Sequence, residues 1–407
     1  MTLKLILFYI IGFIILYLEP IHVAGVSFGI LWKLVLIMLL FLPILYKILK
    51  EKYMETFAFL TIVFALKILI SYTSMDYIVS TLTLFTKELM LPILYFFFIL
   101  KLDEKSLLFL AKHFSILIIL SFVPYMLHIL TPLGHGYNLS AYGLDNQYGL
   151  VGPFMNPHTA SISLAFALIV ITRHISRDNT KIENAFLLFI LLLGLYEILL
   201  TYVRTGFVVY IIVGLYLLLK NITLKKMVLL VTLAITLFMG GVYLYNTNDI
   251  VRMRLSDKNK YVKKAQPGSG RLQYWQSAVE NWLDDEDIVI FIGLGEVYAM
   301  DKMEDRIGER LFAHNKFFQV LQREGLIGFG LLLAILFSLK SFLSKHRESK
   351  YYTTSVAIFI GILTEMMFQG GFYFNVMFLF AIYLALLKKD YLEHINKKEL
   401  KVKTNDN

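Results

Sequence analysis

The stretch Asn184–Lys220, NAFLLFILLLGLYEILLTYVRTGFVVYIIVGLYLLLK, decides the fold class. It consists of two long apolar runs, and Glu197 and Arg204 are its only charged residues before the final lysine. A helix needs roughly 20 apolar residues to cross the hydrocarbon core of a bilayer. The stretch therefore predicts two membrane helices, Asn184–Thr201 and Thr205–Leu219, joined by a very short turn at Arg204.

The composition of the whole chain agrees with this interpretation. Of its 407 residues, 58% are hydrophobic, 17% are charged and none is Cys. These values exclude a soluble globular domain, a disordered chain, a disulfide scaffold and thiol catalysis. The apolar runs are continuous and do not alternate, which disfavours a membrane β-barrel. We expect an all-α polytopic membrane protein of about 12 transmembrane helices, with one large extracytoplasmic loop that carries short amphipathic helices.

Ten further apolar runs complete the predicted set. They are Leu3–Leu18, Ser27–Tyr46, Thr56–Tyr72, Tyr77–Leu100, Ser106–Leu130, Thr159–Thr172, Met227–Tyr245, Gly325–Phe342, Thr353–Phe368 and Phe374–Leu387. The short connections after every second run are rich in Lys and Arg, and the short ones between them have none of either except Arg204. Basic connections stay in the cytoplasm, so we predict a multi-pass protein of the cell membrane with both termini cytoplasmic and an extracytoplasmic active site.

This topology divides the chain into six regions. They are membrane helices 1–5 (residues 1–130), an outer loop (131–158), membrane helices 6–9 (159–245), a large extracytoplasmic loop with the candidate motifs (246–324), membrane helices 10–12 (325–387) and a basic cytoplasmic tail (388–407). Within the large loop, Asn246–Trp275 has seven basic and two acidic residues, whereas Gln276–Ala313 has three basic and ten acidic ones. The basic half is a candidate surface for acidic glycan, and a solvated surface is the default alternative.

Three residues on the predicted outer side suit anion binding and proton transfer. Arg204 lies at a helix start, where the helix dipole and nearby lipid both disfavour a cation. Arg271 follows a Gly-rich hinge and precedes an amphipathic helix at Leu272–Trp282, and its planar fork suits diphosphate. His314 can accept a proton near neutral pH. The alternatives are an Arg at the membrane interface, an ordinary loop Arg and a structural His.

Other charged positions are less informative. The acidic run Asp284–Asp287 suggests a metal site, but it lacks a neighbouring His, so a solvated acidic turn is favoured and no metal is predicted. Glu197 and Glu365 lie in or near predicted spans, where a carboxyl group is costly. Each could line a polar cavity or pair with a Lys in a span such as Lys67, and their roles stay open.

Four stretches within about Leu150–Phe329 then resemble the motifs of one family, in the family's order. They are Gly152–His158 (GPFMNPH), Val203–Gly206 (VRTG), Gly270–Trp275 (GRLQYW), and the run Gly293–Gly295 (GLG), His314–Asn315 (HN) and Glu324–Gly328 (EGLIG). This series resembles the O-antigen polymerase and ligase family, of the Wzy and WaaL type. His158 stands where that family usually has Asn, and Val203 stands where it usually has Ser.

The resemblance implies a metal-independent, inverting membrane glycosyltransferase that needs no cofactor and uses glycan on undecaprenyl diphosphate as its donor. It assigns catalysis to His314, Arg271 and Arg204, with His314 as the general base or orienting group. It assigns substrate binding to Arg204, Arg271, Trp275, Asn156, Asn315 and Arg323. The implied partners are a lipid-linked oligosaccharide donor and acceptor, the lipid bilayer and, as further candidates, a chain-length regulator and a flippase, but no nucleic acid.

Three functions remain open at this point. The leading hypothesis is a polymerase that transfers glycan onto the hydroxyl of a lipid-linked repeat unit, for capsule or O-antigen-like surface polysaccharide. The second is a ligase of the same family that moves finished glycan to a lipid, a wall polymer or a protein. The third is a flippase or exporter of lipid-linked glycan, which would carry charged residues along its spans, whereas here the candidate residues cluster on one side.

Overall fold

The computed structural model describes most of the chain. The described residues are 3–19, 21–23, 26–51, 54–69, 78–127, 129–130, 150–154, 156–176, 179–201, 203–220, 239, 246–247, 271–285, 287–308, 310–370 and 373–405. Apart from residue 239, the predicted span Met227–Tyr245 lies outside them, as do residues 131–149 of the predicted outer loop and residues 248–270 of the basic half of the large loop.

The described residues are almost entirely helical, which confirms the predicted all-α class. The long and medium helices are α1 (Leu3–Leu18), α2 (Phe28–Glu51), α3 (Thr56–Ile68), α4 (Ile78–Lys101), α5 (Glu104–Leu120), α7 (Pro157–His174), α8 (Lys181–Leu200), α9 (Arg204–Leu219), α15 (Lys316–Lys345), α16 (Tyr352–Phe368) and α17 (Phe374–Asn405). The others are α6 (Val123–Met126), α12 (Arg271–Leu283), α13 (Asp287–Ile292) and α14 (Glu296–Ile307). Two short strands, β1 (His22–Val23) and β2 (Val26–Ser27), pair antiparallel.

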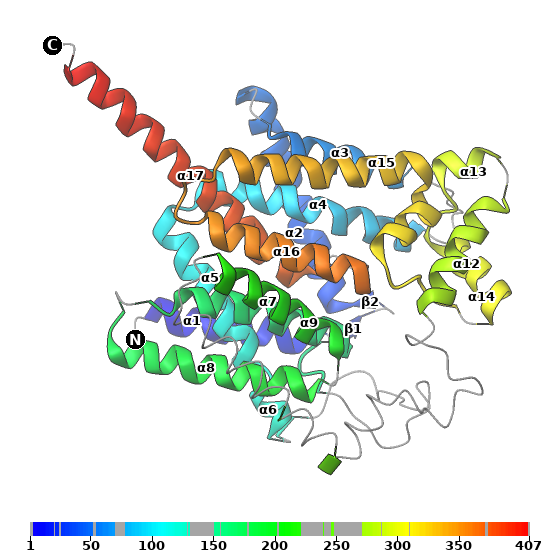
Figure 1. Ribbon diagram of the computed structural model, residues 1–407, viewed down its shortest axis with the longest axis horizontal. Coiled ribbons are helices and arrows are strands. Elements are labelled where there is room, and N and C mark those ends of the chain that lie inside the picture. The colour runs from blue at the N-terminus through cyan, green and yellow to red at the C-terminus, as the bar shows by residue number, and fades with distance from the viewer. Residues whose placement is uncertain are drawn as a thin grey trace.

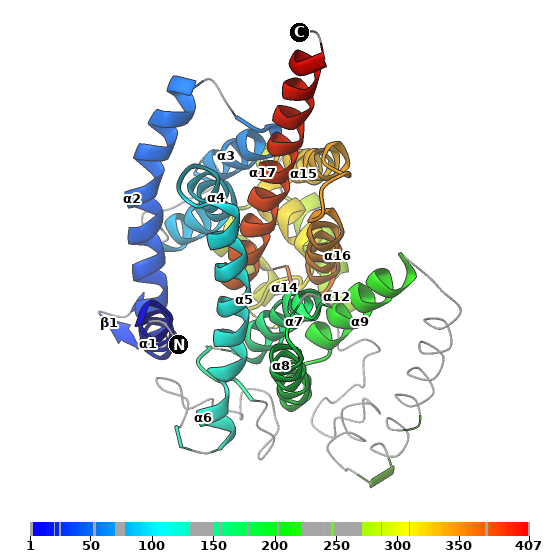
Figure 2. The ribbon, with the colours of Figure 1, turned by 90° about the vertical axis from the view of Figure 1, so that its left-hand side faces the viewer.

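The long helices pack side by side, and the three helices α12–α14 gather at one end of the bundle (Figure 1). We call α12–α14 the cap. Within the bundle, α3 packs against α4 and α15, α4 against α17, and α7 against α5, α8 and α9. The start of α1 and the end of α17 lie at the opposite end from the cap (Figures 1 and 2). The two ends of the bundle therefore carry different parts of the chain.

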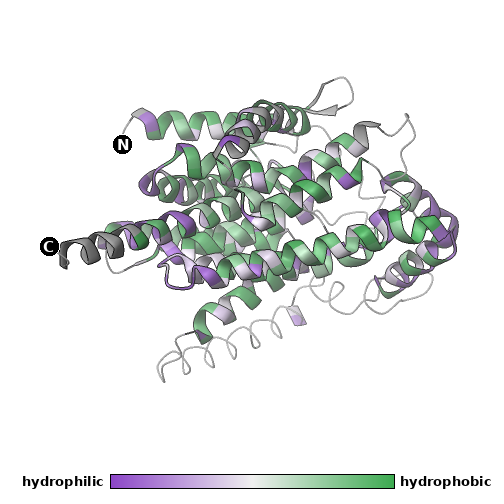
Figure 3. Cartoon of the chain, turned by 90° about the horizontal axis from the view of Figure 1, so that it is seen from above, coloured by the Kyte–Doolittle hydropathy of each residue, from purple (hydrophilic) through white to green (hydrophobic). Residues whose placement is uncertain are grey.

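Several bundle helices expose large apolar side chains that no other described helix covers. On α8, Phe189 and Leu192 are 59% and 58% exposed, and Figure 3 shows the bundle as mostly hydrophobic with polar residues at its ends and in the cap. Among the described residues, four segments are long and apolar enough to cross a membrane: Thr81–Lys101, Glu104–Met126, Lys181–Leu200 and Lys316–Lys345. Apolar faces of this kind suit lipid contact, which supports a membrane location. Twelve spans and the side on which each end lies stay predictions.

Helix α15 is broken where it leaves the cap and enters the bundle. Gly325 has a non-helical backbone (φ 64°, ψ −168°), at the position where the predicted span Gly325–Phe342 begins. The backbone of Gly293, between α13 and α14, crosses α15 there so closely that a side chain at either glycine would clash with the opposite backbone. Two hydrogen bonds join the segments, from Leu294 N to Gln322 O (3.0 Å) and from Gly295 N to Arg323 O (2.8 Å). The glycine motifs thus fasten the cap to the bundle.

Candidate active site

Four cationic or imidazole side chains from separate parts of the chain come together at the cap end. His158 lies in the first turn of α7, and Arg204 and Arg271 are the first residues of α9 and α12. His314 directly precedes Asn315, the helix N-cap residue of α15. Burial is the main cause that lowers the pKa of His158, His314 and Arg271. The charge of Arg271 adds to this effect at both histidines, and the charge of Arg204 adds to it at Arg271. We call these four residues the cationic cluster. It contains all three residues that the sequence predicts to be catalytic.

Arg204 is placed by a close contact between α7 and α9. Gly206 lies against Ser161 so tightly that no side chain would fit, and the Ser161 hydroxyl donates to the backbone oxygen of Val203 (3.3 Å). Thr205 is buried, while Arg204 itself is exposed at the first position of the helix. A cation at a helix N-terminus is opposed by the helix dipole. An anion bound nearby would offset this cost.

Arg271 is half-buried at the start of the cap, with its guanidinium over the ring of Phe368 at 5.8 Å. Burial is the main cause of its lowered pKa, and Arg204 adds to it, although an Arg side chain keeps its charge. Among the described residues, no carboxylate forms an ion pair with Arg271. A partly desolvated cation next to a second cation is a suitable site for a multiply charged anion such as diphosphate.

His314 is held in an unusual backbone conformation beside Arg271. Its φ is +50°, a value that non-glycine residues rarely adopt and that often marks functional positions. Burial, followed by the charge of Arg271, lowers its pKa, and a hydrogen bond with Gln369 opposes this shift. The imidazole is therefore neutral at neutral pH and can accept a proton from a hydroxyl group. The ring of Tyr274 lies 6.1 Å away, centroid to centroid.

The two predicted asparagines each cap the start of a helix and lie within two residues of a histidine of the cluster. Asn156 caps α7 by accepting from Thr159 N (2.8 Å), and Asn315 caps α15 by accepting from Phe317 N (3.0 Å). Asn315 also donates to the backbone oxygen of Met367 (3.1 Å). These bonds account for Asn at both positions. Substrate contact by either residue stays a prediction.

Trp275 and Arg323, both predicted to bind substrate, have different surroundings. Trp275 stacks on Phe318 at 5.5 Å and borders the small core of the cap. Arg323 is only 2% exposed and lies 3.9 Å from Glu296 and 3.7 Å from Glu324. These two carboxylates place Arg323 in a second group of charges, separate from the cationic cluster.

That second group joins the cap end to α3 and α4. Lys67 contacts Glu324 at 2.8 Å and Lys316 contacts Glu88 at 2.7 Å, and all four side chains are buried. Together with Arg323 we call them the buried ionic network. The sequence suggests Lys67 as one partner for Glu197 or Glu365, and the structure pairs it with Glu324 and with the backbone oxygen of Ile292. No motif pointed to Glu88 or Lys316.

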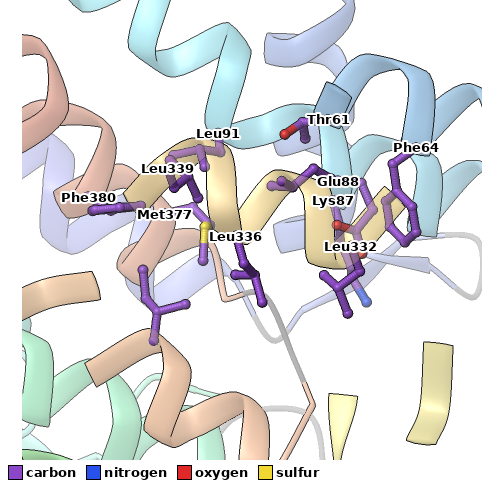
Figure 4. Close-up of a pocket in the computed structure, with 12 residues that line it drawn as sticks. Thr61, Phe64, Lys87, Glu88, Leu91, Leu332, Leu336, Leu339, Met377 and Phe380 are labelled. Atoms are coloured by element: carbon purple, nitrogen blue, oxygen red, sulfur yellow. The ribbon is translucent and has the colours of Figure 1, made fainter. Parts of the chain in front are cut away.

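An apolar groove begins beside this network. It lies between α3, α4, α15, α16 and α17, and most of the side chains that line it are apolar. Lys87 and Glu88 lie at one end, and Leu91, Leu339 and Phe380 lie toward the other (Figure 4). The groove is thus polar only near the network.

The acidic run and Glu197, which the sequence left open, have different surroundings in the structure. In the acidic run, Asp284 pairs with Arg306 and Asp285 with Lys302. Within the described residues, no three His, Cys, Asp or Glu side chains are grouped to hold a metal ion. Glu197 on α8 is fully buried, and its carboxyl oxygens have no hydrogen-bond partner in the part of the chain that the structure describes.

The fold and the site together define a helical membrane protein whose cap end carries two arginines beside a neutral histidine. The family model described as O-antigen ligase matches residues 188–333. This region, which includes Arg204, Arg271 and His314, therefore belongs to the O-antigen polymerase and ligase family, as the sequence motifs indicate. The match ends before Gln369 and begins after His158. No curated protein matches the chain.

Proposed function

We propose that the chain is a polysaccharide polymerase that transfers glycan from undecaprenyl diphosphate to a hydroxyl group of a lipid-linked repeat unit at the outer face of the membrane. The observation that carries the proposal is the cationic cluster. Arg271 has no carboxylate partner among the described residues and lies beside a neutral His314. The family of residues 188–333 and the apolar helices support a membrane enzyme that acts on surface glycans.

In the proposed reaction, His314 takes the proton of the acceptor hydroxyl as its oxygen attacks the anomeric carbon of the donor sugar. The bond between that carbon and the diphosphate oxygen breaks, and undecaprenyl diphosphate leaves with the electron pair. Attack opposite to the leaving group inverts the anomeric carbon. Arg204 and Arg271 stabilise the charge that grows on the phosphate oxygens, which is the part of the transition state that fixed cations assist most. The lipid diphosphate is itself the activated donor, so the reaction needs no nucleotide.

A ligase that transfers finished glycan to another acceptor is the second candidate, because the matching family model is described as O-antigen ligase. The same residues would perform the same chemistry. Only the acceptor differs, so the two functions separate by product. Cells that lack the gene would accumulate single lipid-linked repeats if it encodes a polymerase, and long chains on undecaprenyl diphosphate if it encodes a ligase.

The direct test uses the purified full chain in detergent with lipid-linked repeat units extracted from the deletion strain. Elongation without ATP, nucleotide or a membrane gradient is the expected result, and released undecaprenyl diphosphate is measured alongside the glycan ladder. Activity that requires closed vesicles and moves the glycan without lengthening it would contradict the proposal and favour transport.

A further inference from the structure

Gln369, which lies outside every motif of the sequence, bridges the two imidazoles of the cationic cluster. Its amide nitrogen Nε2 lies 2.5 Å from Nδ1 of His158, and its side chain also forms a hydrogen bond with His314. His158 and His314 are far apart in the sequence, since His158 lies on α7 and His314 lies in the segment before α15. One amide group therefore links both rings.

The fold holds this amide in place from two directions. Gln369 ends α16, and its backbone N–H donates to the backbone oxygen of Glu365 (2.9 Å). Two residues earlier, the backbone oxygen of Met367 accepts the bond from Asn315, the residue after His314. The end of α16 and the start of α15 are thus joined beside the bridge, so Gln369 and His314 keep a fixed relation.

Because an amide has a donor nitrogen and an acceptor oxygen, it fixes which ring nitrogen carries the proton in each neutral histidine. An amide nitrogen can only donate, so Nδ1 of His158 accepts and the proton of neutral His158 lies on Nε2. The hydrogen bond with Gln369 raises the pKa of His314, which is the effect of a ring N–H that donates to an amide oxygen, so the other ring nitrogen of neutral His314 carries no proton. A neutral His314 in this state is ready to take a proton, and His158 retains an N–H to give to an oxygen acceptor.

We propose that Gln369 is a positioning residue that makes His314 the proton acceptor of the site and makes His158 a hydrogen-bond donor to the anionic substrate. The inference rests on the proposed function, because it assigns parts of the transfer reaction. It adds two residues that lie outside the family match. The donated bond from His158 would supplement the charges of Arg204 and Arg271 on the diphosphate.

The charges around the bridge decide how it responds to pH. The charge of Arg271 from α12 favours neutral forms of both imidazoles, and Arg204 from α9 lies beside Arg271. Tyr274 faces His314, and Glu365 lies one turn before Gln369 on α16. Burial is the largest cause that lowers the pKa of His158, to about 4, and it also lowers that of His314. Both rings are therefore neutral at pH 7, as the bridge requires.

The test compares Gln369→Met and Gln369→Glu in the purified full chain, with extracted lipid-linked repeat units as substrate. Gln369→Met keeps the size of the side chain but removes both hydrogen bonds, so kcat should fall about tenfold, which is part of the effect of a general base. In Gln369→Glu, a carboxylate would stabilise protonated His314, so the acid limb of the pH–rate profile should move up by about one pH unit or more. Gln276→Met is the matched control, because that exposed amide contacts Glu280 instead.

His158 supplies a second arm. His158→Asn preserves one hydrogen-bond acceptor and one donor and should retain most of the activity. His158→Leu removes both, so it should raise KM and weaken the binding of undecaprenyl diphosphate. This binding is measured with the lipid in nanodiscs. An unchanged kcat and pH profile in both Gln369 variants would overturn the inference while leaving the proposed function intact. Lack of transfer by the wild-type chain would instead refute the proposed function.

Discussion

The cationic cluster and the buried ionic network lie at the same end of the molecule, but they differ in whether their cations are paired with carboxylates. In the network, each Lys meets a carboxylate, Lys67 with Glu324 and Lys316 with Glu88, and all are removed from solvent. In the cluster, the nearest charge to Arg271 that affects its pKa is another cation, Arg204. The two lysines of the network are therefore neutralised by carboxylates of the protein itself, whereas we propose that the cluster binds an anion from outside the protein.

This difference separates a structural role from a functional one. Buried ion pairs lose most of their Coulomb gain to desolvation, so they chiefly fix how segments meet. Clustered cations of like sign cost folding free energy and are retained where a ligand or a reaction uses them. The comparison predicts that substitutions in the cluster change activity at constant stability, while substitutions in the network change stability first.

The largest effect is expected at His314. His314→Ala removes the proton acceptor and should lower kcat by a factor of about 10²–10⁴, with thermal stability and undecaprenyl diphosphate binding close to wild type. The measurement is release of undecaprenyl diphosphate by the purified variant. His394→Ala is the control, because that exposed ring lies on α17. Full activity of His314→Ala would remove this residue from the mechanism.

The next effect tests the other half of the comparison. Glu88→Gln leaves the buried Lys316 with a neutral partner and should destabilise the fold by about 3–5 kcal/mol, seen as a lower melting temperature in detergent. Glu104→Gln should cost at most about 1 kcal/mol, because Glu104 and Lys350 are partly exposed. If Glu88→Gln melts like wild type but loses activity, the network belongs to the functional site and the comparison fails.

The sequence predicts much of this architecture because membrane helices are set locally. The apolar runs and the turn at Arg204 give α8 and α9, and the Gly-rich stretch before Arg271 precedes the start of α12. The same local signals mark His314, Arg204 and Arg271 as candidates. The structure then brings these three together, which composition and periodicity could not do.

Contacts between distant residues gave no local signal. Glu88 and Lys316 are 228 residues apart, and neither belongs to a charge pattern in the sequence. Gln369 is an ordinary polar residue at a helix end, and its role depends on two rings from other segments. His158 was noted only as a departure from a motif. The roles of such residues can be recognised only from the three-dimensional structure, because they depend on contacts with residues far away in the sequence.

A smaller effect is expected for conservative change at Arg271. Arg271→Lys keeps the charge but loses the planar fork, so the rate should fall about tenfold, mainly through weaker paired bonds to diphosphate. Arg271→Gln removes the charge that lowers the pKa of His314, so the acid limb of the pH–rate profile should move to higher pH. Lys302→Gln is the control cation of the same cap, since Lys302 pairs with Asp285. Equal pH profiles for the Lys and Gln variants would contradict the electrostatic link.

The smallest effect concerns Glu197, which fits neither group. It is as buried as the network but, among the described residues, its carboxyl oxygens have no hydrogen-bond partner. An unsatisfied buried polar group costs free energy, so Glu197→Met should raise stability by about 1 kcal/mol and leave the rate of glycan transfer unchanged. Thermal melting and product release measure the two outcomes on one sample. A stabilised but inactive variant would show that Glu197, like the cationic cluster, is retained for function at the expense of stability, and would extend the functional region along α8.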